Sequence, residues 1–242
     1  MGINVNLPGE YQEIDAAGAP GFILLPPAPG KDTEIPWVWY APTLSGNFPN
    51  EHHHWLIEQL GTNGIAFAGV DVGESCGSPA GRGLFSAFYA EAVSKYPLNR
   101  KASLLPQSRG GMMLYNWAAE NPEKVACIGG IYPVCDLTDR AGRPNILRAY
   151  SLPEAELRKQ LPEHNPIDRL GPLAKAGIRI FHIQGDNDEP VPLEKHSAVL
   201  VERYKELGGS VELKVVPGGE HDMNPVFFRS PALLEFFITN QP

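Results

Sequence analysis

Positively charged residues are scarce in this chain and form no run. Twenty lysines and arginines stand against 28 aspartates and glutamates, which gives a formal net charge of −8 over 242 residues. Proteins that bind polyanions carry clustered basic surfaces. We therefore expect neither nucleic acid nor an anionic membrane as a partner.

Long apolar runs are also missing. No stretch approaches the roughly 18–20 consecutive apolar residues that cross a bilayer. The first residues, MGINVNLPGEYQ, have neither the basic start nor the apolar stretch of a signal peptide. We expect no membrane association. A cytoplasmic location is the default expectation, with secretion as the alternative if a signal peptide has been removed.

Cysteines and metal-binding patterns are few. The three cysteines, Cys76, Cys127 and Cys135, are odd in number and too few for a disulfide framework. Neither HExxH nor CxxC occurs. The histidines from His52 to His54 cannot converge on one ion, because adjacent helical side chains point about 100° apart. We expect no metal and no cofactor, and we place this histidine run at the wall of a substrate cleft.

The other histidines fall in different contexts. His182 lies inside a strand-like apolar run, which favours a structural role. His164 and His196 lie in polar, helix-like segments, and we expect both to face solvent. His221 follows a glycine pair after an apolar strand, where a strand end exposes a side chain.

Glycine and proline together make up about one residue in five, which indicates many ordered turns. Between these turns, short apolar runs alternate with segments of helical periodicity. The expected strands cover residues 22–27, 37–42, 65–72, 102–107, 125–134, 178–186 and 211–219, and the expected helices cover residues 52–64, 86–96, 110–122, 193–209 and 232–240. This alternation predicts a mainly parallel central sheet flanked by helices. We expect one α/β domain over residues 1–242, with a cap-like helical insertion at about 136–175.

One short stretch carries a chemical signal. A predicted strand runs into Ser108, and a predicted helix begins just after it with Gly110 two positions on. Such a sharp strand–turn–helix corner lifts a hydroxyl above the sheet edge and turns the first N–H groups of the helix toward it. A serine at a helix start also serves as an N-cap. Taken alone, this stretch leaves both interpretations open.

A carboxylate and a histidine follow in the chain. A serine hydroxyl is unreactive near neutral pH without a base and a group that orients that base. Asp186 and Asp188 follow one predicted strand, and His221 follows the next. The carboxyl ends of parallel strands share one edge of a sheet. We therefore expect Ser108, an aspartate and His221 to meet at that edge.

These motifs resemble those of the α/β-hydrolase fold family, in particular its small esterases and dienelactone-hydrolase-like members. The resemblance covers residues from about 20 to 240. It rests on the turn at Ser108, the GDNDEPVP and GGEHD loops, and the DVGESCGS loop at 71–78. No cysteine occupies the nucleophile position, which argues against a cysteine-dependent hydrolase.

The resemblance implies a role for each residue. Ser108 is then the nucleophile, His221 the general base and acid, and Asp188 the carboxylate that orients the histidine. Asp186 supports its own loop through local hydrogen bonds. Asp136 follows the predicted strand 125–134 and is the alternative orienting group.

A developing oxyanion needs two N–H donors. Arg109, directly after the serine, supplies one. The loop after WVWYAP supplies the other through Thr43 or Leu44, because Pro42 has no N–H. The Arg109 side chain lies either near the oxyanion or in a surface ion pair. Pro106 departs from the family pattern, which has a small residue two positions before the serine.

The sequence thus predicts a serine carboxylesterase that cleaves short-chain esters through an acyl-enzyme. Acetyl or aryl esters of carbohydrate or plant-derived compounds are the substrate class that we expect. A serine peptidase, a thioesterase and a non-catalytic ligand-binding protein of the same fold are the alternatives. The sequence leaves open whether the protein is a monomer or a homodimer.

Overall fold

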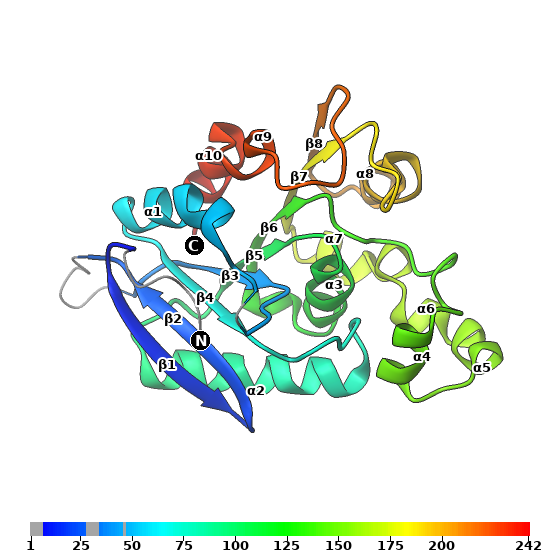
Figure 1. Cartoon of the computed structure of the whole chain (residues 1–242), viewed down its shortest axis with the longest axis horizontal. Helices are drawn as coiled ribbons and strands as arrows, with labels where there is room; N and C mark the ends of the chain where they lie inside the picture. Colours follow the sequence, from blue (N-terminus) through cyan, green and yellow to red (C-terminus); the bar gives the residue numbers. More distant parts are fainter. Residues whose placement is uncertain (1–6, 28–33, 46) are drawn as a thin grey trace.

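The computed structural model describes residues 7–27, 34–45 and 47–242, and its strands form one eight-stranded sheet (Figure 1). The strands are β1 (Glu10–Ala16), β2 (Ala19–Leu25), β3 (Trp37–Ala41), β4 (Ala66–Val70), β5 (Ala102–Pro106), β6 (Val125–Ile131), β7 (Arg179–Gly185) and β8 (Val211–Val216). Their order across the sheet is β1-β2-β4-β3-β5-β6-β7-β8. Strands β3 to β8 are parallel to one another, whereas β2 is antiparallel to both β1 and β4. This confirms the mainly parallel sheet predicted from the sequence.

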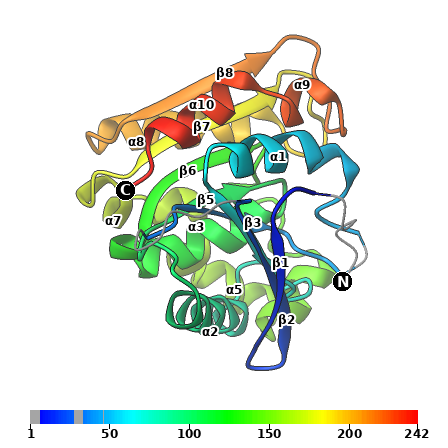
Figure 2. The same cartoon turned by 90° about the vertical axis from the view of Figure 1, so that its left-hand side faces the viewer.

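Helices cover both faces of the sheet. They are α1 (His54–Thr62), α2 (Pro79–Lys95), α3 (Gly110–Glu120), α4 (Pro144–Tyr150), α5 (Glu154–Lys159), α6 (Leu161–His164), α7 (Gly171–Lys175), α8 (Ser197–Glu206), α9 (Pro225–Phe228) and α10 (Pro231–Thr239), with short 3-10 turns η1 (Glu51–His53), η2 (Pro122–Lys124), η3 (Pro166–Asp168) and η4 (Leu193–Lys195). Figure 2 shows α1 and α10 on one side of the sheet and α2 on the other. Helix α2 begins before the predicted residue 86, because Ser78 caps it and Pro79 fits its first turn.

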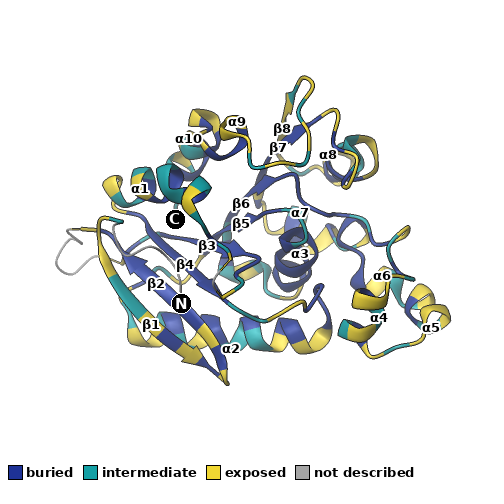
Figure 3. Cartoon of the chain, in the orientation of Figure 1, coloured by how far each residue is buried: buried dark blue, intermediate teal, exposed yellow. Residues whose placement is uncertain are grey.

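Two apolar cores form, one on each face of the sheet. Successive side chains of a strand point to opposite faces. In β3, Trp37 and Trp39 therefore join the core beneath α2 and α3, while Val38 and Tyr40 join the core beneath α1 and α10. Both faces of β3 are buried, as expected for a central parallel strand. Figure 3 shows the central strands and α3 buried, with exposed residues along β1, α5 and α8.

Strand β1 was not predicted from the sequence. Its residues EYQEIDA are mostly polar and half-exposed, because it lies at the edge of the sheet and pairs only with β2. The turn that joins the two strands has positive φ angles at Ala17 and Gly18, +55° and +83°. Two positive φ angles in sequence are typical of the tight type I′ hairpin turn. Ala17 is an unusual residue for such a turn, which explains why the pattern gave no hairpin signal.

The segment between β6 and β7 contains the helices α4 to α7. Figure 1 shows α4, α5 and α6 gathered at one side of the molecule, beyond the end of α2. Ile146 and Leu157 from these helices share a small apolar cluster with Cys76, Met112 and Val191 of the main body. Within the described ranges, no helix combines the length and the apolar character needed to cross a bilayer.

Candidate active site

Ser108 stands in a tight turn between β5 and α3. Its φ is +48°, a left-handed value that is uncommon for a residue other than glycine and marks a strained corner. The Ser108 N–H donates to the carbonyl of Ile131 at 3.0 Å, and its carbonyl accepts from the N–H of Val134 at 2.7 Å. The segment after β6 thus fixes the serine backbone on both sides. Pro106 is the last residue of β5, so the strand ends before the corner begins.

The two glycines that open α3 allow this corner to form. A Cβ on Gly110 would lie 2.0 Å from the carbonyl oxygen of Ala41, and one on Gly111 would lie 2.4 Å from that of Val134. No side chain fits at either position, so the start of α3 passes directly against two neighbouring loops. The Arg109 N–H, at the start of α3, has no intramolecular partner among the described residues.

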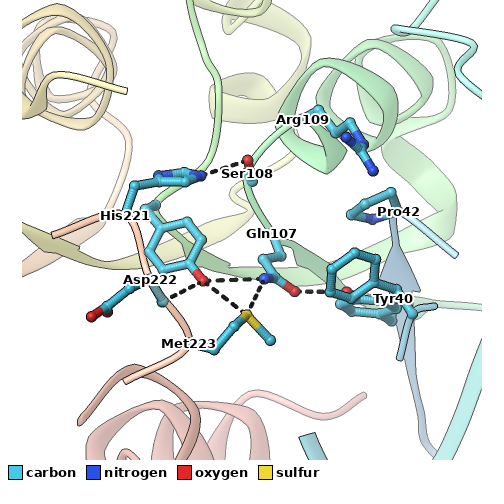
Figure 4. Close-up of a pocket in the computed structure, with 10 residues that line it drawn as sticks. Tyr40, Pro42, Gln107, Ser108, Arg109, His221, Asp222 and Met223 are labelled. Carbon is cyan, nitrogen blue, oxygen red and sulfur yellow. Dashed lines mark hydrogen bonds between the residues drawn. The ribbon is translucent and has the colours of Figure 1, made fainter. Parts of the chain in front are cut away.

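Ser108, His221 and Asp188 form a hydrogen-bonded chain. The Oγ of Ser108 lies 2.9 Å from Nε2 of His221, as Figure 4 shows. Nδ1 of His221 lies 2.8 Å from Oδ2 of Asp188. The Asp188 side chain is fully buried, and its other oxygen accepts from the N–H of Val191 at 2.8 Å. A carboxylate held this way fixes the orientation of the imidazole ring.

The other two candidate carboxylates have different partners. Asp186 accepts a hydrogen bond from the N–H of Gly218 at 2.6 Å, and so ties its loop to the loop that carries His221. Asp136 accepts from Thr138 and from the Nδ2 of Asn165. Neither forms a hydrogen bond to the histidine.

A hydrogen-bonded network of Tyr132, Gln107 and Tyr40 lies beside His221. The ring of Tyr132 lies 4.3 Å from the imidazole ring, centroid to centroid, and its hydroxyl donates to the carbonyl of Asp222 at 3.0 Å. Gln107 donates through Nε2 to the Tyr132 hydroxyl at 3.1 Å, and its Oε1 accepts from the hydroxyl of Tyr40 at 2.6 Å. Burial raises the pKa of both tyrosines, which keeps them neutral. Figure 4 shows Gln107 between Tyr40 and the histidine loop.

A cavity of about 210 Å³ opens beside Ser108. It is lined by Tyr40, Pro42, Phe48, Gln107, Ser108, Arg109, Tyr132, His221, Asp222 and Met223. Pockets for drug-sized ligands start at roughly 300 Å³, and an apolar cavity of about 150 Å³ is known to hold one benzene molecule. The cavity therefore fits a group the size of a single ring or a short alkyl chain.

The loop after β3 carries the predicted second N–H donor. The N–H of Leu44 donates to the carbonyl of Phe48 at 3.0 Å. Among the described residues, the N–H of Thr43 has no such partner, and it follows Pro42, which lines the cavity. Asp71 holds the loop by accepting from the N–H of Ser45 at 2.8 Å. Thr43 is therefore the better placed of the two candidate donors.

The Arg109 side chain lies on the opposite side of Ser108 from His221, above Pro42 (Figure 4). One of its terminal nitrogens lies 3.3 Å from Oε1 of Glu74. Both side chains are partly exposed, and both contact a second cavity, described below.

Only the middle histidine of the run from His52 to His54 is buried. The Nε2 of His53 lies 2.8 Å from Oε1 of Gln107, behind the cavity rather than in its wall. Burial lowers the pKa of His53 to about 4, so the ring is neutral at pH 7. No group of three or more His, Cys, Asp or Glu side chains suited to a metal ion is found in the described chain.

The prediction that His164 and His196 face solvent is wrong. Both are buried, because contacts from distant segments cover them. Nδ1 of His196 accepts from the N–H groups of Cys135 and Asp136, and the ring of His164 lies 4.9 Å from that of Tyr150. Neither contact has a local signal in the sequence.

His182 is buried, as expected for a structural residue. Its ring lies between the hydroxyls of Tyr115 and Ser197, at 2.7 and 2.9 Å. The three cysteines are free and buried. Burial raises the pKa of Cys76 to about 11, which disfavours a reactive thiolate.

Sequence reasoning missed most of the cavity wall. Among the aromatic residues of β3, only Tyr40 lines the cavity, because Trp37 and Trp39 point into the opposite core. Tyr132 and Met223 were not identified. Their one available signal is position, since Tyr132 directly follows β6 and Met223 lies two residues after His221.

The sequence matches no protein-family model and no curated protein. Solved structures resemble it more clearly. Est1E from Butyrivibrio proteoclasticus aligns with a TM-score of 0.68 at 16% identity, over 95% of this chain and 98% of that one. The S-formylglutathione hydrolase from Agrobacterium tumefaciens aligns with a TM-score of 0.71 at 13% identity, over 96% and 95%.

A peptidase also shares the architecture. Porphyromonas gingivalis dipeptidyl peptidase 4 aligns with a TM-score of 0.75 at 13% identity, over 97% of this chain. The chain spans only 36% of the length of that peptidase. At such low identities these likenesses establish the fold alone.

Proposed function

We propose that this chain, which has the α/β-hydrolase fold, is a serine carboxylesterase that cleaves short-chain esters through an acyl-enzyme on Ser108. The observation that carries the proposal is the hydrogen-bonded chain from Ser108 through His221 to Asp188, with distances of 2.9 and 2.8 Å. A buried carboxylate, an oriented imidazole and a hydroxyl in this order are the parts of a catalytic triad.

The mechanism follows from these contacts. Asp188 accepts a hydrogen bond from Nδ1–H of His221 and stays ionised, which leaves Nε2 free to take the proton of Ser108. The Ser108 oxygen then attacks the ester carbonyl carbon. His221 returns the proton to the departing alcohol, the C–O bond breaks, and the acyl group remains on Ser108. Water, deprotonated by His221, attacks the acyl carbon; the bond to the Ser108 oxygen then breaks, His221 returns the proton to Ser108, and the acid leaves.

Two N–H groups stabilise the negative oxygen of the tetrahedral intermediate. In our proposal they belong to Arg109, which lines the cavity, and to Thr43, which follows the lining residue Pro42; neither N–H has a backbone partner in the described part of the chain. Donors fixed in place before reaction are worth about 10²–10³ in rate each. The close packing of Gly110 on Ala41 supports this arrangement, since it holds the two loops together.

The size of the cavity supports a small substrate group. At about 210 Å³, it takes a short acyl chain or one aromatic ring. Acetyl or aryl esters of carbohydrate or plant-derived compounds remain our expected substrate class. No cofactor or metal takes part in this mechanism.

A substrate series tests the proposal. Rates would be measured on p-nitrophenyl esters from acetate to decanoate, on acetyl p-nitroanilide, and on acetyl- and butyryl-coenzyme A. We expect turnover of the esters to fall beyond butyrate, and the anilide and the thioesters to react far more slowly. Faster cleavage of the anilide than of the esters would indicate a peptidase instead of an esterase. Faster cleavage of the thioesters than of the esters would indicate a thioesterase. Turnover of none would favour a ligand-binding protein.

A further inference from the structure

A second cavity, of about 170 Å³, adjoins the first, and Ser108, Arg109 and His221 line both. A molecule in the second cavity would therefore lie beside the proposed nucleophile and base. The remaining wall comes from the start of the segment between β6 and β7, from the loop after β4 and from the loop that carries Asp188.

The wall of this second cavity is positively charged, although the chain as a whole is acidic. Three arginines line it, Arg109, Arg140 and Arg143, and Glu74 is the one carboxylate among its lining residues. Glu74 pairs with Arg109 at 3.3 Å. No other carboxylate of the described residues lines this cavity, although Asp136, Asp139 and Asp188 act on the charge of Arg140 from outside the lining.

Arg140 and Arg143 lie close enough to repel each other. Burial lowers the pKa of Arg140, and the charge of Arg143 lowers it further. Arg140 donates to the carbonyl of Pro190, which anchors it beside the Asp188 loop. The exposed Arg143 side chain has no hydrogen bond or ion pair with any described residue. Two adjacent guanidinium groups, one of them unpartnered, suit an oxyanion that bridges them.

We propose that this cavity binds the anionic group of the substrate, a carboxylate or a phosphate, while the uncharged part of the ester occupies the cavity over Tyr40. This inference rests on the proposed esterase function and narrows its substrate class to anionic esters. The cleaved bond then lies between the two cavities, at Ser108. Arg143 gives the group its counter-charge, and Arg140 fixes its position.

Matched pairs of substrates test this inference. In the first pair, meta-acetoxybenzoate is compared with meta-acetoxybenzamide, which places the charge on the alcohol half. In the second, p-nitrophenyl hydrogen adipate is compared with p-nitrophenyl hexanoate, which places it on the acyl half. We expect the anion to raise kcat/KM by at least about tenfold in one pair. The preference should weaken at high salt, because partly exposed charges are screened.

Two arginine variants test whether Arg143 causes the preference for anionic substrates. Arg143→Gln should remove most of the preference for the anion. Arg148→Gln, at an exposed position on α4, the helix that begins just after Arg143, should leave it intact. Equal kcat/KM for the charged and uncharged members of both pairs would overturn the anion site and leave the esterase proposal standing. An anion preference that survives Arg143→Gln would also overturn it.

A binding measurement separates this inference from the proposed function. Calorimetry with the Ser108→Ala variant would compare benzoate, phenyl phosphate and benzamide. Tighter binding of benzoate or phenyl phosphate than of benzamide, lost in the added Arg143→Gln background, supports the site even if no ester is cleaved. Tighter binding of benzoate would indicate a carboxylate substrate, and tighter binding of phenyl phosphate would indicate a phosphate substrate. Equal binding of all three would overturn the inference whatever the turnover.

Discussion

At the scale of single residues, two aspartates two positions apart have different tasks. Asp188 is fully buried and contacts His221, whereas Asp186 bonds to the backbone of Gly218 and joins two loops. The resemblance implied this division, and the hydrogen bonds are compatible with it. In our proposal only Asp188 sets the orientation and charge of the histidine.

The two aspartates can be separated by matched variants. Asp188→Asn should lower kcat for ester hydrolysis by roughly 10³–10⁴-fold, because an amide favours the wrong tautomer of His221. Asp186→Asn keeps an oxygen that can accept from Gly218, so its kcat should stay close to wild type. The kcat of both variants would be measured by steady-state kinetics on p-nitrophenyl acetate. A larger loss in Asp186→Asn would give the orienting role to Asp186.

At the scale of elements, the geometry of the site depends on where α3 begins. The helix starts within two residues of Ser108, and Gly110 lets it pass directly against the end of β3. The end of β3 and the start of α3 are thereby held against each other next to Ser108. The same contact places Pro42 in the wall of the cavity, with Thr43 next in the chain.

This close approach predicts a large difference between two glycine variants. In Gly110→Ala, the new methyl group would overlap the carbonyl of Ala41, so the free energy of unfolding should fall by at least about 2–4 kcal/mol and activity should be lost. Gly83→Ala, in the exposed middle of α2 with open space around it, should raise stability by about 0.5–1 kcal/mol. Urea unfolding measures both. Similar stability of the two variants would contradict the close packing.

Elements with regular patterns were predictable from the sequence, and contacts between distant elements were not. The central strands were found because burial on both faces gives continuous apolar runs. Ser108 and Asp188 stood out because each follows such a run, and His221 because it follows the next strand, β8, after a glycine pair. Tyr132 escaped notice because its partners, Gln107 and Asp222, lie in the segments that follow two other strands, β5 and β8.

At the scale of the whole molecule, stability depends on histidines that are buried in different parts of the fold. Burial lowers the pKa of His53 and His196 to about 4 and that of His182 to about 3. All three are neutral in the folded protein at pH 7. In the unfolded chain they titrate near their ordinary value of 6.5.

The free energy of unfolding therefore depends on pH. As pH falls through 6.5, the unfolded chain binds protons that the folded protein does not, so unfolding becomes easier. The stability that these histidines contribute is therefore fully present above about pH 6.5 and should decline by up to about 1.4 kcal/mol per pH unit for each histidine as pH falls toward 4. Urea unfolding at pH 7, 6 and 5 measures this decline. A free energy of unfolding that stays constant from pH 7 to 5 would show that these histidines take up protons in the folded state.

The nucleophile itself gives the most direct test of the account. The intact mass of the protein would be measured after reaction with a fluorophosphonate, followed by peptide mapping. We predict a single adduct on Ser108, absent in Ser108→Ala and formed more slowly in His221→Ala. An unmodified wild-type protein, or an adduct on another residue that persists in Ser108→Ala, would contradict the proposed role of Ser108.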